Sequence, residues 1–199
     1  MSVNPTAGFG FRYSRNMSGG APTCQIQQFY ILSNYATQIF KGDLVVFNAG
    51  YIQLASVGTT TIAGVFDGCE YLSTSLKQPR WSPYWPGSDS SNTALKCWVI
   101  TDPYAVFIAR SNGANISQAN VDQNINFATG TGNTSSGLST QMLDQSTINT
   151  TSTLPFRIIN VGNNSLSPFL QYPANDSTTA NNLVEVAFNN AMLRNNTAV

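Results

Sequence analysis

Hydrophobic and polar positions alternate over short stretches of this chain, and glycine, proline or asparagine separates one stretch from the next. The stretch TQIFKGDLVVFNAGYIQLAS, residues 37–56, predicts two strands joined by a hairpin turn at Asn48-Ala49-Gly50. Further strands are predicted at residues 59–72, 95–100, 104–110, 125–128, 154–162 and 183–189. No segment keeps helical spacing of apolar residues over three turns. The pattern therefore predicts an all-β fold, an antiparallel barrel or sandwich.

Two regions lack this alternation. Residues 1–35 are rich in Gly, Pro, Ser and Asn and carry isolated aromatic residues, so they are predicted to form an extended N-terminal arm. Residues 36–199 are predicted to be the core domain, with a long polar loop at 129–151. Ordering about 35 residues costs roughly 1–2 kcal/mol each in backbone entropy, and offsetting that cost requires more than about a thousand Å² of buried apolar contact. The arm is therefore expected to become ordered on a neighbouring subunit.

The segment KQPRWSPYWPGS, residues 77–88, contains three prolines and two of the three tryptophans of the chain. Each proline fixes φ and removes a backbone donor, so this segment is predicted to be a stiff loop or an edge strand. Two interpretations of Trp81, Tyr84 and Trp85 stay open. They cap one end of the chain's own core, or they anchor a partner, since Trp, Tyr and Arg are enriched at interface hot spots.

Charged residues make up only 9% of the chain, with nine basic and nine acidic side chains. This balance provides neither the basic stripe that nucleic acid requires nor a polybasic patch for a membrane surface. The 22 asparagines, with Ser, Thr and Gln, supply most of the polar surface. Weak self-repulsion suits a protein that packs against copies of itself, and a closed homo-oligomer protects strand edges. We expect a trimer first and a dimer next.

Candidate catalytic and metal-binding groups are sparse. The chain has no histidine, which removes the commonest metal ligand and the commonest general base. Asp67 and Glu70 lie three residues apart on one predicted strand, which places them on opposite faces instead of together as a glycosidase pair. A calcium-binding loop requires several closely spaced carboxylates, whereas the carboxylates of this chain are scattered along the sequence. The sequence also shows no phosphate-binding loop. The sequence therefore predicts a protein that is not an enzyme, with no metal and no cofactor.

The chain has three cysteines, Cys24, Cys69 and Cys97. An odd number does not indicate a disulfide framework, so these residues are predicted to be reduced thiols. The first residues, MSVNPTAGFGFRYSRNM, show no apolar region of the kind found in signal peptides. No apolar run approaches the length of about 20 residues that a membrane helix requires.

Several stretches, taken in order, resemble one family. They are GFGFR (8–12), KGDLVVFNAGYIQLA (41–55), TTTIAGVFDGCEYL (59–72), SPYWPGS (82–88), ITDPYAVFIAR (100–110), GLSTQMLD (137–144) followed by TLPFRIINV (153–161), and LVEVAFNNA (183–191). The series is similar to tailed-bacteriophage virion proteins that decorate or cement the capsid shell. The resemblance covers nearly the whole chain, and its most specific parts are GVFDGCEY, YWPGS and the region from STQMLD to LPFRI.

The resemblance implies a structural virion protein that binds the outer surface of a phage capsid as a symmetric oligomer. It would be assembled in the host bacterial cytoplasm and would cement neighbouring capsomers of the major capsid protein. The alternative is a carbohydrate-binding or adhesin module of a virion or tail. The subunit or capsid interface is expected to use aromatic and arginine side chains of the arm and of the 77–88 segment: Phe9, Phe11, Arg12, Tyr13, Phe29, Tyr30, Arg80, Trp81, Tyr84 and Trp85.

Overall fold

The computed structural model describes residues 4–19, 25–87, 95–161 and 175–194. In these parts of the chain the elements are strands, apart from two short 3-10 helices at Gln118–Asn120 and Met192–Arg194. The strands are β1 (Arg12–Asn16), β2 (Ile26–Tyr30), β3 (Ile39–Phe40), β4 (Leu44–Asn48), β5 (Tyr51–Leu54), β6 (Gly64–Leu72), β7 (Pro79–Ser82), β8 (Tyr84–Trp85), β9 (Lys96–Ile100), β10 (Ala105–Arg110), β11 (Asn124–Ala128), β12 (Met142–Asn149), β13 (Phe156–Val161) and β14 (Leu183–Phe188). The predicted all-β fold is confirmed.

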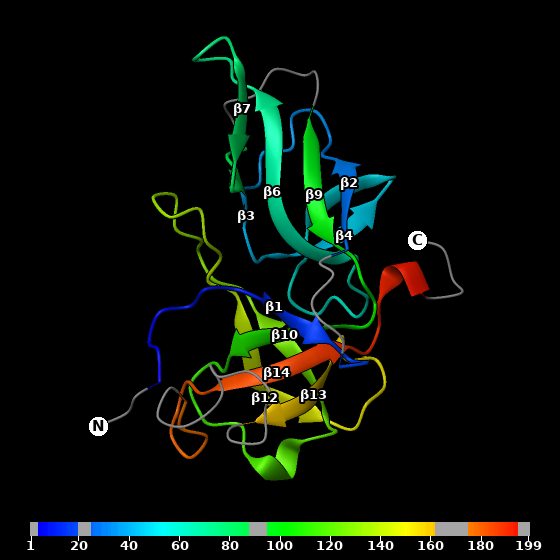
Figure 1. Cartoon of the computed structure of the whole chain (residues 1–199), viewed down its shortest axis with the longest axis vertical. Coiled ribbons are helices and arrows are strands. Elements are labelled where there is room, and N and C mark those ends of the chain that lie inside the picture. The colour runs from blue at the N-terminus through cyan, green and yellow to red at the C-terminus, as the bar shows by residue number, and fades with distance from the viewer. Residues whose placement is uncertain (1–3, 20–24, 88–94, 162–174, 195–199) are drawn as a thin grey trace.

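The strands form two large antiparallel sheets, one at each end of the molecule (Figure 1). The lower sheet has the order β1-β10-β14-β13-β11-β12. The upper sheet has the order β2-β9-β6-β4-β5, with β7 paired to the second half of β6, and a small third sheet joins β3 to β8. The sheets are not closed into barrels. Of the two predicted architectures, barrel and sandwich, the structure therefore agrees with the sandwich.

One hydrophobic cluster joins the two halves. The larger buried cluster includes Phe107, Phe156 and Val186 of the lower sheet, together with Leu44 and Val65 of the upper sheet. A second cluster lies within the upper half. Because the larger cluster takes side chains from both sheets, the halves are packed as a single unit.

Strands in which apolar and polar residues alternate, and strands joined by a short hairpin turn, lie where the sequence pattern predicted them. The hairpin of β4 and β5 turns at Ala49 and Gly50, whose φ angles of 49° and 84° are both positive, as a type I′ turn requires. The stretches predicted at 95–100, 104–110, 125–128, 154–162 and 183–189 correspond to β9, β10, β11, β13 and β14. The stretch predicted at 59–72 becomes a strand only from Gly64 onward.

The prediction that residues 129–151 form a loop throughout was wrong for Met142–Asn149, which is strand β12. This strand pairs with β11 and is the last strand of the lower sheet. Among its eight residues only Leu143 is buried. An edge strand that is mostly half-exposed needs little apolar alternation, so the hydrophobic pattern did not reveal it.

The N-terminal arm is extended, but its described residues pack on the chain's own sheets. Strand β1 pairs with β10 and β2 pairs with β9, and Phe11 is buried between the halves. The Asn4 amide donates hydrogen bonds to the backbone oxygens of Asp176 and Ala180 at 2.8 and 2.9 Å. These contacts correct the expectation that the arm requires a neighbouring subunit for its order. Residues 1–3 and 20–24 of the arm lie outside the described parts of the chain.

Three segments cross at the junction between the sheets: residues 8–11, the turn at 40–43 and residues 137–141. The backbone N–H of Lys41 donates to the Gly137 oxygen at 3.0 Å, and the Lys41 oxygen accepts from Ser139 at 2.9 Å. Gly10 has a φ of +74°, and a Cβ there would lie 2.6 Å from the Gly42 oxygen. Only a glycine allows the arm to cross this closely.

Asp43 connects two of these segments through its carboxylate. The backbone N–H of Phe40 donates to Oδ2 at 2.7 Å, and the Ser139 hydroxyl donates to Oδ1 at 2.6 Å. Burial raises the pKa of Asp43 from 3.8 to about 6, although the hydrogen bonds from Ser139 and Phe40 act to lower it. The folded protein therefore holds a proton on Asp43 over a pH range in which the unfolded chain has lost it.

This raised pKa predicts that the Asp43 contribution to stability is fully present below about pH 4 and is lost as the pH rises through about 6. A shift of about two pKa units corresponds to at most about 3 kcal/mol of unfolding free energy. The measurement is the midpoint of urea unfolding at several pH values for the wild type and for Asp43→Asn. The difference between the two proteins should change with pH in this window, and a constant difference would contradict the assignment.

Candidate interaction surface

Strand β7 is an outer strand of the upper sheet and lies at its upper end in Figure 1. It pairs with β6 through the register Glu70 to Trp81 and Tyr71 to Arg80, and among the described residues no strand pairs with its other edge. Pro79 begins the strand and Pro83 follows it. The prediction of an edge strand is confirmed for Pro79–Ser82.

Pro79, Arg80 and Trp81 are the exposed residues of β7. Arg80 and Trp81 are neighbours in the strand, so their side chains lie on opposite faces of the sheet. The Trp81 side chain is 59% exposed, the largest exposed fraction of any aromatic side chain described. Its indole ring lies against Gly68 of β6, where a Cβ would be 3.0 Å from the ring. Gly68 thus lets the ring lie close to the β6 backbone and leaves much of its surface open to a partner.

Trp85 has the opposite environment although it lies only four residues further along the chain. It is fully buried, and its Nε1 donates a hydrogen bond to the backbone oxygen of Tyr35 at 2.9 Å. Its ring packs edge-on against Tyr71 with the centroids 5.7 Å apart. Tyr84 is half-buried and stacks on Phe40 at 5.3 Å. Trp85 is therefore a core residue and cannot itself touch a partner of the folded chain.

Four of the six arm residues among the candidates lie around the junction between the sheets. Phe9, Phe11, Arg12 and Tyr13 all line one small pocket of about 280 Å³. The Arg12 guanidinium lies over the Phe9 ring, 5.3 Å from its centroid, and Arg12 is exposed. Phe11 is buried against Phe156 with the ring centroids 4.9 Å apart, so it serves the core and not the surface.

Phe29 and Tyr30 lie on β2, the first strand in the order of the upper sheet. Tyr30 is 53% exposed, whereas Phe29 packs edge-on against Phe47 at 5.0 Å. The ten candidate residues are therefore not one patch. Exposed candidates lie at three separate places: Arg80 and Trp81 on β7, Arg12 beside the half-buried Phe9, and Tyr30 on β2. Phe11 and Trp85 belong to the core.

The groups considered for chemistry have structural partners. Lys41 Nζ forms an ion pair with Asp67 at 2.6 Å, on the bulge of β6 next to Gly68. Cys69 and Cys97 face each other in the register of β6 and β9 as buried free thiols. Burial raises the pKa of both thiols, that of Cys97 to about 12, so both are protonated at neutral pH. Cys24 lies outside the described residues.

Metal and membrane features can be assessed for the described parts of the chain. There, no group of three or more Asp, Glu, Cys or His side chains could hold a metal ion. No helix in those parts has the length and apolar character that crossing a membrane requires.

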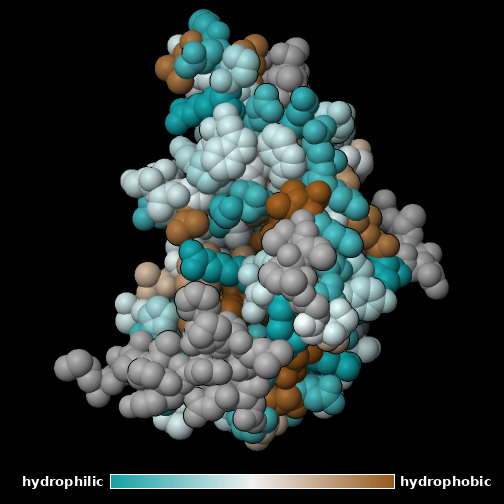
Figure 2. Space-filling view, in the orientation of Figure 1, coloured by the Kyte–Doolittle hydropathy of each residue, from teal (hydrophilic) through white to brown (hydrophobic). Residues whose placement is uncertain are grey.

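The face of the molecule shown in Figure 2 is a mosaic of hydrophilic and weakly polar residues, on which hydrophobic residues form small separate groups. The exposed large hydrophobic residues are spread in the same way over the described chain, from Met17 and Ile26 to Trp81, Tyr104 and Leu193. A partner binding such a surface would depend on a few anchoring side chains and not on one wide apolar patch.

No protein-family model, no curated protein and no solved structure matches this chain. A function is therefore inferred from the geometry of the exposed groups and from the sequence.

Proposed function

We propose that this protein is a structural component of a phage virion that binds the outer surface of the capsid and cements neighbouring capsomers of the major capsid protein. The proposal combines the family resemblance of the sequence with an exposed, preorganised docking strand. It includes assembly in the host bacterial cytoplasm and a final position on the virion surface.

The observation that carries the proposal is the exposed Trp81 side chain on the outer strand β7, with the exposed Arg80 next to it on the opposite face of the strand. Binding energy at protein interfaces is concentrated in a few Trp, Tyr and Arg side chains. Presenting such side chains on a preorganised backbone lowers the entropy cost of binding. Pro79 and Pro83 restrict the backbone on both sides of this pair, and Trp85 holds the end of the segment in the core. The anchors are therefore presented by a rigid element.

A symmetric homo-oligomer, with a trimer preferred over a dimer, is part of the proposal. The exposed strands β7 and β2 carry Trp81 and Tyr30, and a net formal charge of zero opposes association only weakly. Closed symmetry would cover strand edges that otherwise promote aggregation.

Electron microscopy of particles that contain this chain tests the proposal directly. We expect density for many copies on the outer shell, at symmetry positions between capsomers. The alternative, a carbohydrate-binding or adhesin module, is favoured by the open indole face of Trp81, which could stack on a sugar. That alternative predicts a few copies at the tail, so the copy number separates the two functions.

Replacement of Trp81 by alanine is expected to weaken binding to bare capsids by about 2–4 kcal/mol, the range of an interface hot spot. The thermal unfolding midpoint of the free protein should stay nearly unchanged because the side chain is 59% exposed. Co-sedimentation with capsids at several protein concentrations measures the affinity.

Tyr104→Ala is the matched control for this measurement, because Tyr104 is 53% exposed but lies in the turn between β9 and β10. We expect its capsid affinity to equal that of the wild type. Equal affinity for the wild type and for Trp81→Ala would show that β7 is not the docking strand.

A further inference from the structure

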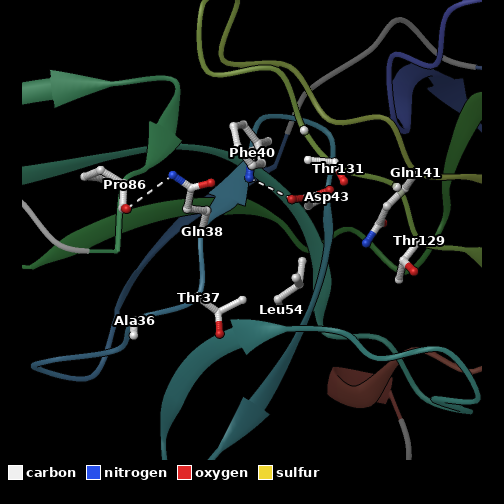
Figure 3. A pocket seen from close by; sticks show the side chains of 12 residues that line it. Ala36, Thr37, Gln38, Phe40, Asp43, Leu54, Pro86, Thr129, Thr131 and Gln141 are labelled. Atoms are coloured by element: carbon white, nitrogen blue, oxygen red, sulfur yellow. Dashed lines mark hydrogen bonds between the residues drawn. The ribbon is translucent and has the colours of Figure 1, made fainter.

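A second pocket lies between the strands β3 and β8 on one side and the β11–β12 connection on the other (Figure 3). Its volume is about 450 Å³, within the range of about 300–1,000 Å³ that is usual for small-molecule sites. Side chains from segments far apart in the chain surround it, including Thr37, Leu54, Thr129 and Gln141. It is separate from β7 and from the pocket lined by the arm.

The chemistry of the lining is polar and almost free of charge. Among the described residues that line the pocket there are three threonines, two glutamines and one carboxylate, Asp43, but no lysine or arginine. Apolar contact surface comes from Phe40, Leu54 and Pro86. The lining thus offers several neutral hydrogen-bonding groups beside apolar ones.

Gln141 is a buried lining residue whose side-chain amide is only partly hydrogen-bonded. It is only 1% exposed, and its Oε1 accepts a hydrogen bond from the Leu44 backbone N–H at 2.9 Å. Because a backbone N–H can only donate, this contact fixes which end of the amide is oxygen. The Nε2 group, with two N–H donors, then has no partner. In Figure 3 this nitrogen points toward the side of the pocket where Leu54 and Thr129 lie.

Unpaired buried donors are rare in folded proteins because each one forfeits its hydrogen bonds to water. A group that enters the pocket and accepts from Gln141 Nε2 would restore them. Asp43, on the same pocket, supplies the complementary acceptor, since its two oxygens have lone pairs beyond those used by Phe40 and Ser139.

We propose that this pocket binds a neutral saccharide, with Gln141 Nε2 donating to a sugar oxygen and the Asp43 carboxylate accepting from a hydroxyl. A sugar hydroxyl both donates and accepts, so it matches a wall that presents donors and acceptors side by side. The half-buried Leu54 and Pro86 provide contact for the apolar C–H groups of a sugar ring. The proposal is independent of capsid binding and does not use β7.

Other small ligands fit the described lining less well. An anion would face a carboxylate with no cation beside it. A divalent cation prefers several oxygen ligands of which some are charged, and a single carboxylate is available. A purely apolar ligand would leave the Gln141 donors unpaired.

The test is ligand-observed NMR of the full-length protein with a panel of neutral mono- and disaccharides, followed by titration of those that bind. Gln141→Glu keeps the acceptor for Leu44 but replaces the two donors with an oxygen. Thr37→Trp fills the pocket from an exposed position and leaves Gln141 intact. Thr134→Trp is the control, because Thr134 is exposed and does not line the pocket.

We expect at least one saccharide to bind to the wild type and to Thr134→Trp equally. Affinity should fall at least about tenfold in Gln141→Glu and in Thr37→Trp, as expected when a hydrogen bond to the ligand is lost or the space is filled. Circular dichroism confirms the fold of each variant. Absence of binding by every neutral saccharide, or binding that survives Thr37→Trp, would overturn the proposal. Binding of short neutral peptides in place of sugars would overturn it as well.

Discussion

Replacement of Trp85 by alanine is expected to lower the free energy of unfolding by about 3–5 kcal/mol, the cost of truncating a large aromatic side chain in a core. Trp85 is fully buried in the upper-half cluster and packs against Tyr71. The change also removes the Nε1 donor that pairs with the backbone oxygen of Tyr35. Packing and hydrogen bonding are therefore lost together.

Urea unfolding followed by circular dichroism measures this loss, and Trp81→Ala is the matched control in the same segment. Since Trp81 is exposed on β7, its replacement should change the free energy of unfolding by no more than about 0.5 kcal/mol. Similar losses in both variants would contradict the division into a core and a surface tryptophan. Trp85→Phe should be intermediate, because it keeps an aromatic ring but not the donor.

The sequence could not distinguish these two tryptophans because the chain changes partner between them. Up to Ser82 the segment pairs with β6, and from Tyr84 onward it pairs with β3. Pro83 lies at the change, so the period-2 alternation of one strand does not extend across it. Prolines and composition predict an edge, but which ring faces the core depends on the strands that come to lie beside it.

The same difference between local and long-range information explains the rest of the fold. The β4–β5 hairpin was predictable because its turn residues and its apolar alternation are neighbours in sequence. Strand β12 was not, since its position depends on pairing with β11 and its side chains are mostly polar. Strand β1 was missed for the same reason, because its stability comes from pairing with β10.

The pocket illustrates the limit most clearly. Asp43 and Ser139 are 96 residues apart, and Leu44 and Gln141 are 97 residues apart, yet each pair is joined by a hydrogen bond. In the sequence Asp43 is one polar residue within the predicted strand region 37–56, and Gln141 is one polar residue within a polar stretch. No spacing rule connects them, so neither could be selected as a site residue before their positions were known.

The second large effect is expected at the only ion pair, among the described residues, that has a fully buried member. Glu185 of β14 has no exposed side-chain surface, and Arg15 of β1 donates to its Oε2 at 3.0 Å and to its Oε1 at 3.4 Å. Ser14 adds a hydrogen bond at 3.3 Å. Strands β1 and β14 both pair with β10, so this contact bridges across one strand and fastens the N-terminal arm to the lower sheet.

Replacement of Arg15 by methionine is expected to lower the free energy of unfolding by about 3–5 kcal/mol, because it leaves a buried carboxylate without its cation. Methionine keeps much of the apolar stem, so the loss reports mainly on charge. Urea unfolding measures it, and the reference is the double variant Arg15→Met/Glu185→Gln, which removes both charges. The double variant should recover most of the lost stability, since a neutral amide costs less to bury than an unpaired charge.

A double variant no more stable than Arg15→Met would mean that the charge of Glu185 is not the cause and that β1 is held by packing. Limited proteolysis provides a second measurement, which reports on the arm itself. If the ion pair fastens it, limited proteolysis of Arg15→Met should cleave the arm before the rest of the lower sheet, and Glu185→Gln should restore its protection in the double variant. The order in which the arm and the sheet become accessible then distinguishes local release of β1 from unfolding of the whole domain.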